Sequence, residues 1–353
     1  MFIKILKLLW MYINLFFRAL EFKFYFFNKN SNKNKNIFFF VLDHSSFTSN
    51  YDITRYIIYL AIKSKYKKVK IIVVPPLKLF DAVYNKEKNI ESMNYFRSIN
   101  IVYPVLKLVK NFDPEISFFD TREEAYRYIG QNNSRILSNF KKSLERKLIF
   151  EKLLFRYFNK YKTIPRLEAH AVHKDIVERK FSDYIKNKKL ITITLKYSSY
   201  YTNENSNLEA WNKITKILEN NNFKIIIIRD FEQVISNKNN DYNELNRNSF
   251  DLAVIDPSLR LALYEKSILN LGVSMGPFNS FIFFSNAYFL CFKTKNLKKL
   301  DYKRRYGVKN QKINFQFPFF NDKQKIVYKD DDFESILEEI KQYFIKDNII
   351  INS

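Results

Sequence analysis

The residues best placed to do chemistry lie in the stretch from Asp256 to Asn279. Asp256-Pro257 predicts a helix start, because aspartate is a favoured N-cap and proline fits the first helical turn. The apolar run over 268–273 then predicts a strand, and Gly276-Pro277 starts a second helix directly after it. Free backbone amides at such a start, together with the helix dipole, attract anions. This spacing indicates a phosphate site at the Gly276-Pro277 turn; the alternative is a turn that serves structure alone.

Side chains around this turn could contribute to the same site. The chain holds only 4 Gly, so Gly276 stands out as a residue that lets a phosphate approach the backbone closely. Ser274 could bind phosphate through its hydroxyl. Asn279 could hydrogen-bond a sugar or a base, and helix capping is the alternative role for its amide.

Two series of strands and helices must position this turn. Short continuous apolar runs bounded by polar residues indicate buried parallel strands. In the first series these runs cover 37–42 and 70–74, with a helix over 51–64 between them. A further strand is expected near Ile101, and helical stretches run from 121 to about 160. The strand–helix–strand order predicts a right-handed parallel crossover.

The second series repeats this order. Apolar runs predict strands over 190–195, 224–228, 268–273 and 288–292. Ser206 and Glu209 fit a capping box that opens a helix after the first of these strands. Two such series predict an α/β fold of two Rossmann-like, doubly wound domains that face each other across a cleft. Ligands of such folds bind at the carboxyl ends of the strands.

Composition divides the chain into five parts. These are an amphipathic segment over 1–27, a polar linker over 28–36, a first α/β domain over 37–165, a second over 166–335, and a C-terminal helix and tail over 336–353. The longest charge-free stretch of the first part, Leu8 to Phe17, is well short of the ~20 residues that span a bilayer. Its lysines and aromatic residues favour a helix lying in a membrane interface. An amphipathic helix packed on the protein body is the alternative.

The charge balance bears on the partners. Lys plus Arg outnumber Asp plus Glu by 60 to 36, which gives a formal net charge of +24. Such an excess favours a phosphorylated substrate, an anionic membrane surface or another polyanion, and solvated lysine is the alternative explanation. No RNP-type, zinc-finger or basic-zipper motif accompanies the charge, so no specific nucleic-acid partner is expected. The single Cys291 cannot form an internal disulfide and suits a buried core thiol.

The stretch from Arg260 to Val273, together with Met275-Gly-Pro-Phe-Asn279, resembles the donor-site region of GT-B glycosyltransferases. It is similar in pattern to the heptosyltransferase family, whose turn reads Asp-Ser/Thr-Gly-Pro-x-His. Met275 stands where that family has Ser or Thr, and Asn279 where it has His; both departures speak against carrying over an ADP-heptose donor. The chain from about 37 to 345 also resembles a group of bacterial proteins linked to surface-glycan synthesis.

The resemblance implies a glycosyltransferase of GT-B architecture that moves a sugar from a nucleotide-sugar donor to a glycan or lipid-linked acceptor. It makes 37–165 the acceptor domain and 166–335 the donor domain. Arg260 and Lys196 become candidates to neutralise the donor diphosphate. Asn205 and Gln316 become candidates to hydrogen-bond the sugar or the base; surface or capping roles are their alternatives. A cytoplasmic protein at the inner face of the membrane is the expected setting.

An inverting transfer also needs a general base to take the proton of the acceptor hydroxyl. Asp43 at the end of the first strand and Asp52 at the start of the next helix are the candidates, and the sequence does not choose between them. No cofactor or metal is expected beyond the nucleotide-sugar co-substrate, because His170 and His173 lack further ligands at metal spacing. The sequence leaves two alternatives open: a sugar-nucleotide epimerase of the same fold, or a non-catalytic binding protein in a glycan assembly system.

Overall fold

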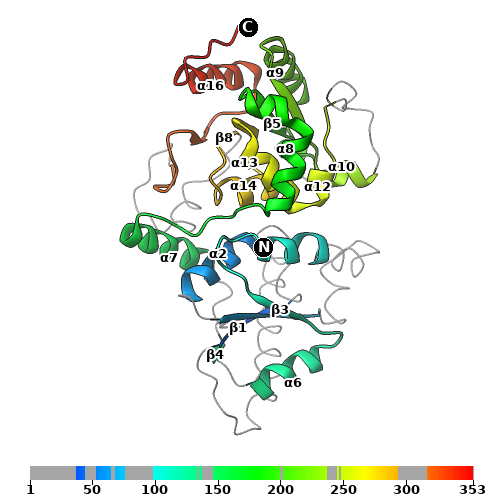
Figure 1. Cartoon of the computed structure of the whole chain (residues 1–353), viewed down its shortest axis with the longest axis vertical. Coiled ribbons are helices and arrows are strands. Elements are labelled where there is room, and N and C mark those ends of the chain that lie inside the picture. Colours follow the sequence, from blue (N-terminus) through cyan, green and yellow to red (C-terminus); the bar gives the residue numbers. More distant parts are fainter. Residues whose placement is uncertain are drawn as a thin grey trace, which may run out of the picture.

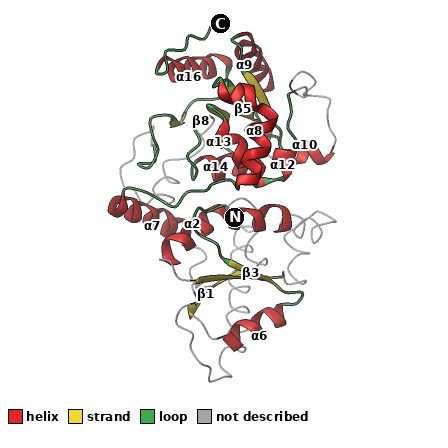
Figure 2. Cartoon of the chain, viewed as in Figure 1, coloured by secondary structure: helices red, strands yellow, loops and turns green. Residues whose placement is uncertain are grey.

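The computed structural model describes the following residues: 37–43, 53–64, 68–75, 98–132, 135–136, 146–198, 202–236, 245, 248–292 and 316–352. They form two α/β units, one above the other in Figure 1, each built on a parallel sheet (Figures 1 and 2). The segments over 1–27 and 28–36, and Asp52, lie outside the described residues. Among the helices that are described, none has the length and apolar character needed to cross a bilayer.

The first sheet has the strand order β3-β2-β1-β4, and every neighbouring pair is parallel. Its strands are β1 (Ile37–Asp43), β2 (Lys68–Val74), β3 (Glu115–Phe118) and β4 (Arg135–Ile136). The described helices of this unit are α2 (Ile53–Ser64), α5 (Tyr103–Leu106), α6 (Arg122–Asn132) and α7 (Arg146–Tyr161). The parallel β1–β2 pair with α2 between them confirms the predicted crossover unit.

The strand expected near Ile101 is wrong. Ser98–Val102 forms a π-helical turn that runs directly into α5, and the third strand of the sheet comes later, as β3. Periodicity alone does not distinguish a short apolar run in a helix from one in a buried strand. Pro104 decides the case, because proline fits the first turn of a helix and would remove a ladder hydrogen bond from a central strand.

The second sheet has the order β6-β5-β7-β8-β9, again all parallel. Its strands are β5 (Leu190–Thr194), β6 (Lys224–Ile228), β7 (Leu269–Val273), β8 (Phe289–Phe292) and β9 (Gln324–Ile326). The first four match the predicted runs within two residues. The fifth was missed, since three residues are too few to show an apolar run.

Helices cover both faces of the second sheet. They are α8 (Ala171–Lys186), α9 (Leu208–Asn220), α10 (Phe231–Ser236), α12 (Leu252–Ile255), α13 (Pro257–Lys266), α14 (Gly276–Ile282) and α16 (Phe333–Ile345). Side chains of α9 and α16 pack on one face with alternate strand residues such as Ile193 and Leu271. Side chains of α8, α13 and α14 pack on the other face. The predicted α/β fold with two doubly covered parallel sheets is confirmed.

Local capping decides where these helices begin. Asp256 accepts hydrogen bonds from the amides of Ser258 and Leu259, so the predicted N-cap of α13 is confirmed. The predicted capping box at Ser206 is wrong by one residue, because Asn207 caps α9 by accepting from the Ala210 amide. The Ser206 hydroxyl accepts from the Lys196 amide instead, which ties the helix start to the end of β5.

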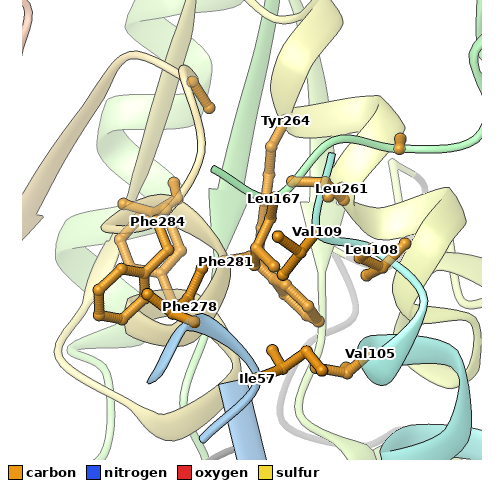
Figure 3. Packing of buried hydrophobic residues seen from close by; sticks show 14 of the residues in the cluster. Ile57, Val105, Leu108, Val109, Leu167, Leu261, Tyr264, Phe278, Phe281 and Phe284 are labelled. Atoms are coloured by element: carbon orange, nitrogen blue, oxygen red, sulfur yellow. The ribbon is translucent and has the colours of Figure 1, made fainter. Parts of the chain in front are cut away.

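The two units meet through apolar side chains. Figure 3 shows Ile57 of α2 and Val105 of α5 on one side and Leu261 of α13 and Phe281 of α14 on the other. All four belong to one buried cluster that also includes a face of each sheet. Where the described parts of the units touch, the expected cleft is therefore closed by a packed core.

Candidate functional site

The strand order of the second sheet marks a binding edge. The chain passes from β5 outward to β6, returns to the other side of β5 as β7, and continues to β8 and β9. Ligands of doubly wound sheets bind at the carboxyl ends of the strands where this direction reverses, here between β5 and β7. Thr194 pairs with Gly272, so the two strands end nearly level. Lys196 follows one strand and Ser274 the other.

The turn after β7 has the predicted form. Helix α14 begins at Gly276 with Pro277 in its first turn, and Met275 precedes it in an extended conformation without a side-chain cap. Gly276 is exposed. Within the described residues, no acceptor pairs with the amides of Gly276 and Phe278. This short helix therefore leaves backbone donors free at the switch point.

Asn279 holds the turn in place. Its Nδ2 donates to Ser274 Oγ over 2.9 Å, and its Oδ1 accepts from Cys291 Sγ over 3.4 Å. Complete burial raises the pKa of the Cys291 thiol, so this group stays neutral and serves as a donor rather than a nucleophile. The hydroxyl of Ser274 keeps its own proton for another acceptor.

Gly272 is a structural requirement that the sequence analysis missed. A Cβ atom there would lie 3.0 Å from the Thr194 carbonyl oxygen and 3.2 Å from the Phe278 ring. The missing side chain lets the first turn of α14 pack down on β7. In the sequence, only the rarity of glycine in this chain hinted that position 272 requires it.

Arg260 lies on α13, at 2% exposure. Its Nε donates to the Ala253 carbonyl over 2.7 Å, while its buried Nη1 has no partner within the described residues. One helical turn further along α13, the Tyr264 hydroxyl bonds Thr194 Oγ1 at the end of β5 over 2.9 Å. After α13, the Ile268 amide bonds Leu190 at the start of β5. The helix thus runs against the strand, and Arg260 lies on the carboxyl-end side of Tyr264.

Three other candidates have their side chains engaged in the protein. Lys196 forms an ion pair with Glu204. The amide of Asn205 bonds both the backbone N–H and the carbonyl of Ser198, over 2.7 and 3.2 Å. The amide of Gln316 does the same to Ile326 in β9, over 2.8 Å each way. These contacts brace loops, and they leave Arg260, Ser274 and the Gly276 turn as the candidates with unused donors.

The two candidate bases are placed only in part. Asp43 is the last residue of β1, and β1 neighbours β4 at the point where the order of the first sheet reverses. Its backbone is therefore at the switch point of the first sheet. The side chain of Asp43 and all of Asp52 lie outside the described residues, so their catalytic role stays a prediction.

One polar cluster was not anticipated. His173 Nδ1 lies 3.1 Å from Ser258 Oγ, and His173 Nε2 lies 3.2 Å from Asp256 Oδ2. The three side chains have the composition of a catalytic triad, but Asp256 already caps α13, and Ser258 Oγ also accepts from the His170 amide over 3.4 Å. The cluster joins α8 to the capped start of α13, which is the structural role of His173.

Comparisons with known proteins give likenesses of fold at low identity. No family model and no curated protein matches the chain. The E. coli ADP-heptose LPS heptosyltransferase II structure is 11% identical, with a TM-score of 0.46, over 89% of this chain and 100% of that one. A glycosyl transferase family 9 protein from Veillonella parvula is 9% identical, with a TM-score of 0.47, over 90% and 99%.

A third solved structure, the wall teichoic acid polymerase TagF, is 12% identical, with a TM-score of 0.39, over 95% of this chain and 87% of that one. Likenesses at this level do not assign an activity. What the chain itself displays is a pair of parallel α/β units, as expected from the resemblance to GT-B proteins. The function therefore has to be argued from the strand ends of the second sheet.

Proposed function

We propose that the protein is a glycosyltransferase that moves a sugar from a nucleotide-sugar donor to a glycan or lipid-linked acceptor in cell-surface polysaccharide synthesis. The observation that carries the proposal is the carboxyl edge of the second sheet. Free amide donors at Gly276 and the Ser274 hydroxyl lie at the β5–β7 switch point, and Arg260 lies in the first half of α13, a helix that begins on this carboxyl-end side of the sheet. Donors and a cation at a switch point suit a nucleotide diphosphate.

The chemistry follows from these groups. In the proposed step the acceptor hydroxyl attacks the anomeric carbon, the bond from that carbon to the diphosphate breaks, and the nucleotide diphosphate leaves with the electron pair. Amides and Arg260 would stabilise the charge that develops on the leaving group. Asp43 or Asp52 of the first unit would take the hydroxyl proton. Metal independence and contact of 1–27 with the inner face of the membrane belong to the same proposal.

The test is incubation of the purified protein with a panel of UDP-, GDP- and ADP-sugars and a membrane-lipid extract as acceptor source. Release of the nucleotide diphosphate, and a rise in unfolding temperature with the same donor, are expected. If no nucleotide sugar raises the unfolding temperature, the proposal is wrong. Interconversion of the donor sugar without transfer would identify an epimerase instead.

The matched variants are Asp43→Asn and Asp52→Asn, which remove a carboxylate and keep the volume. One of the two is expected to lower turnover by about 100-fold or more, the usual range for a lost general base, without changing donor binding. Full turnover in both variants would exclude both as the base. Unchanged cellular activity of both, with no turnover in the wild type, would indicate a binding protein.

A further inference from the structure

Arg260 is a buried cation with too few hydrogen-bond partners among the described residues. Its side chain is 2% exposed, its Nε has one carbonyl acceptor, and its buried Nη1 has none. No described carboxylate forms an ion pair with it. A guanidinium carries five donors in a rigid fork and remains charged at any ordinary pH. Burying it with one hydrogen bond therefore costs free energy that an arriving anion would recover.

Two other arginines show how acceptors of this chain satisfy the N–H donors of a guanidinium whose role is structural. Arg229 bonds both oxygens of Asp251, through its Nε at 3.0 Å and through an Nη2 contact. Arg166 donates to the Ser285 carbonyl over 3.0 Å and to the Phe319 carbonyl over 2.7 Å. Arg260 is among the largest fully buried side chains of the described residues, and it has the poorest set of partners of the three.

The other two unpaired buried side-chain atoms also lie near the starts of helices. Besides Arg260 Nη1, the buried side-chain atoms without a partner in the described part of the chain are Thr54 Oγ1 and Gln233 Oε1. Thr54 is in the first turn of α2, which follows β1 and packs on α14. Gln233 is in the first turn of α10, which follows β6 and packs on α12. All three atoms thus belong to helix starts on the carboxyl-end side of a sheet.

We propose that Arg260 is the principal anion-binding group of this site, and that it takes a phosphate of the ligand through its unused Nη donors. This rests on the proposed function, in which the ligand is a nucleotide diphosphate. The guanidinium fork matches two phosphate oxygens. It supplies a full charge, whereas the seven-residue helix α14 offers only backbone amides. The ligand-free protein is consequently less stable than the same fold with a neutral residue at position 260.

The experiment compares Arg260→Met with Arg166→Met, since each removes one guanidinium that is at least partly buried and keeps most of the apolar stem of the side chain. The unfolding temperature of the full chain is measured without ligand and with inorganic pyrophosphate, UDP, GDP or ADP. Without ligand, Arg260→Met is expected to unfold at or above the wild-type temperature, and Arg166→Met several degrees below it. The affinity of Arg260→Met for the diphosphate should fall roughly 10- to 100-fold, while Arg166→Met keeps the ligand-induced rise.

Arg260→Lys adds a second measurement. It keeps a charge but loses the fork, so its affinity should lie between those of the wild type and Arg260→Met. The proposal is overturned if Arg260→Met is destabilised as much as Arg166→Met, because that marks an arginine completed by a carboxylate of this chain. It is also overturned if Arg260→Met keeps the wild-type response to every diphosphate.

The inference and the proposed function fail in distinguishable ways. If pyrophosphate stabilises the wild type through Arg260 but no nucleotide sugar is turned over, the anion site stands and the glycosyltransferase proposal falls. If sugar transfer occurs and Arg260→Met retains both turnover and diphosphate binding, the glycosyltransferase proposal stands and the role of Arg260 falls.

Discussion

The junction around Arg166 holds a half-buried arginine and the strand ends around Arg260 hold a fully buried one, yet only the first surrounds its arginine with acceptors. Two carbonyls accept from Arg166 at 3.0 Å or less, and its guanidinium lies 5.5 Å from the centre of the Phe319 ring. Burial lowers the pKa of Arg166 to about 10, which still leaves it charged at neutral pH. Arg260 is more deeply buried and has one acceptor among the described residues.

The surrounding backbone differs in the same way. At the junction, Leu167 donates to the Phe284 carbonyl over 2.7 Å, and Glu168 donates to the Leu108 carbonyl over 2.7 Å, so this segment is bonded to both units. At the strand ends, the amide of the exposed Gly276 and the proton of Ser274 have no acceptor among the described residues. A buried donor without a partner costs free energy, so the unpaired Nη1 of Arg260 indicates a ligand, whereas the satisfied groups around Arg166 indicate a structural role.

The largest effect is expected from Arg166→Met. Several hydrogen bonds from a charged group are lost and their carbonyls stay buried, so the free energy of unfolding should fall by about 3 kcal/mol or more. Chemical denaturation measures this. Arg156→Met on the exposed side of α7 is the control and should stay within about 0.5 kcal/mol of the wild type. Equal stabilities of Arg166→Met and Arg156→Met would show that the hydrogen bonds of Arg166 do not stabilise the fold, and would contradict its contrast with Arg260.

Gly272→Ala should have the next largest effect. The new methyl group would meet the Thr194 carbonyl at 3.0 Å and the Phe278 ring at 3.2 Å, and overpacking of this kind costs about 1–3 kcal/mol. Gly276→Ala is the matched comparison. It should change stability little, because the residue is exposed in a helical first turn, but weaken diphosphate binding. A loss of stability in Gly276→Ala with unchanged binding would make this turn structural.

Asp256→Ala tests whether the start of α13 positions Arg260. The carboxylate accepts from two amides, and loss of an N-cap costs about 1 kcal/mol. Diphosphate affinity should fall with it, because Arg260 is four residues into the helix. Asp332→Ala removes the cap of α16, whose amide partner is Ser335, and should cost a similar amount without changing affinity. Equal diphosphate affinities in the two variants would show that the Asp256 cap does not position Arg260 for binding.

The smallest effect is expected from Glu168→Gln, read as a function of pH. Hydrogen bonds from Lys110 and Lys174 lower the pKa of Glu168. A lowered pKa stabilises the fold above the unfolded value near 4.5, and this contribution is lost as the pH falls through the folded value. With 36% side-chain exposure the contribution is under about 1 kcal/mol. The difference in unfolding temperature from the wild type should shrink between pH 7 and about pH 3; a constant difference would contradict it.

Local signals accounted for much of the fold. Continuous apolar runs located β1, β2 and the first four strands of the second sheet, because buried parallel strands need such runs. Asp256 was recognised as a cap because the side-chain oxygen acts within one helical turn. The strand expected near Ile101 failed because an apolar run of that length is compatible with helix and strand alike. The cap at Asn207 was missed because Ser206 bonds a residue far away in the sequence, Lys196.

The sequence by itself determined that helices start at Asp256-Pro257 and Gly276-Pro277, since capping depends on neighbouring residues. It also placed Arg260 and Ser274 among the candidates. Only the tertiary structure decided that β7 returns beside β5, because strand pairing order depends on contacts between residues distant in the sequence. The same holds for the burial of Arg260 with one acceptor and for the need for glycine at position 272. Both depend on packing between α13, α14 and the sheet.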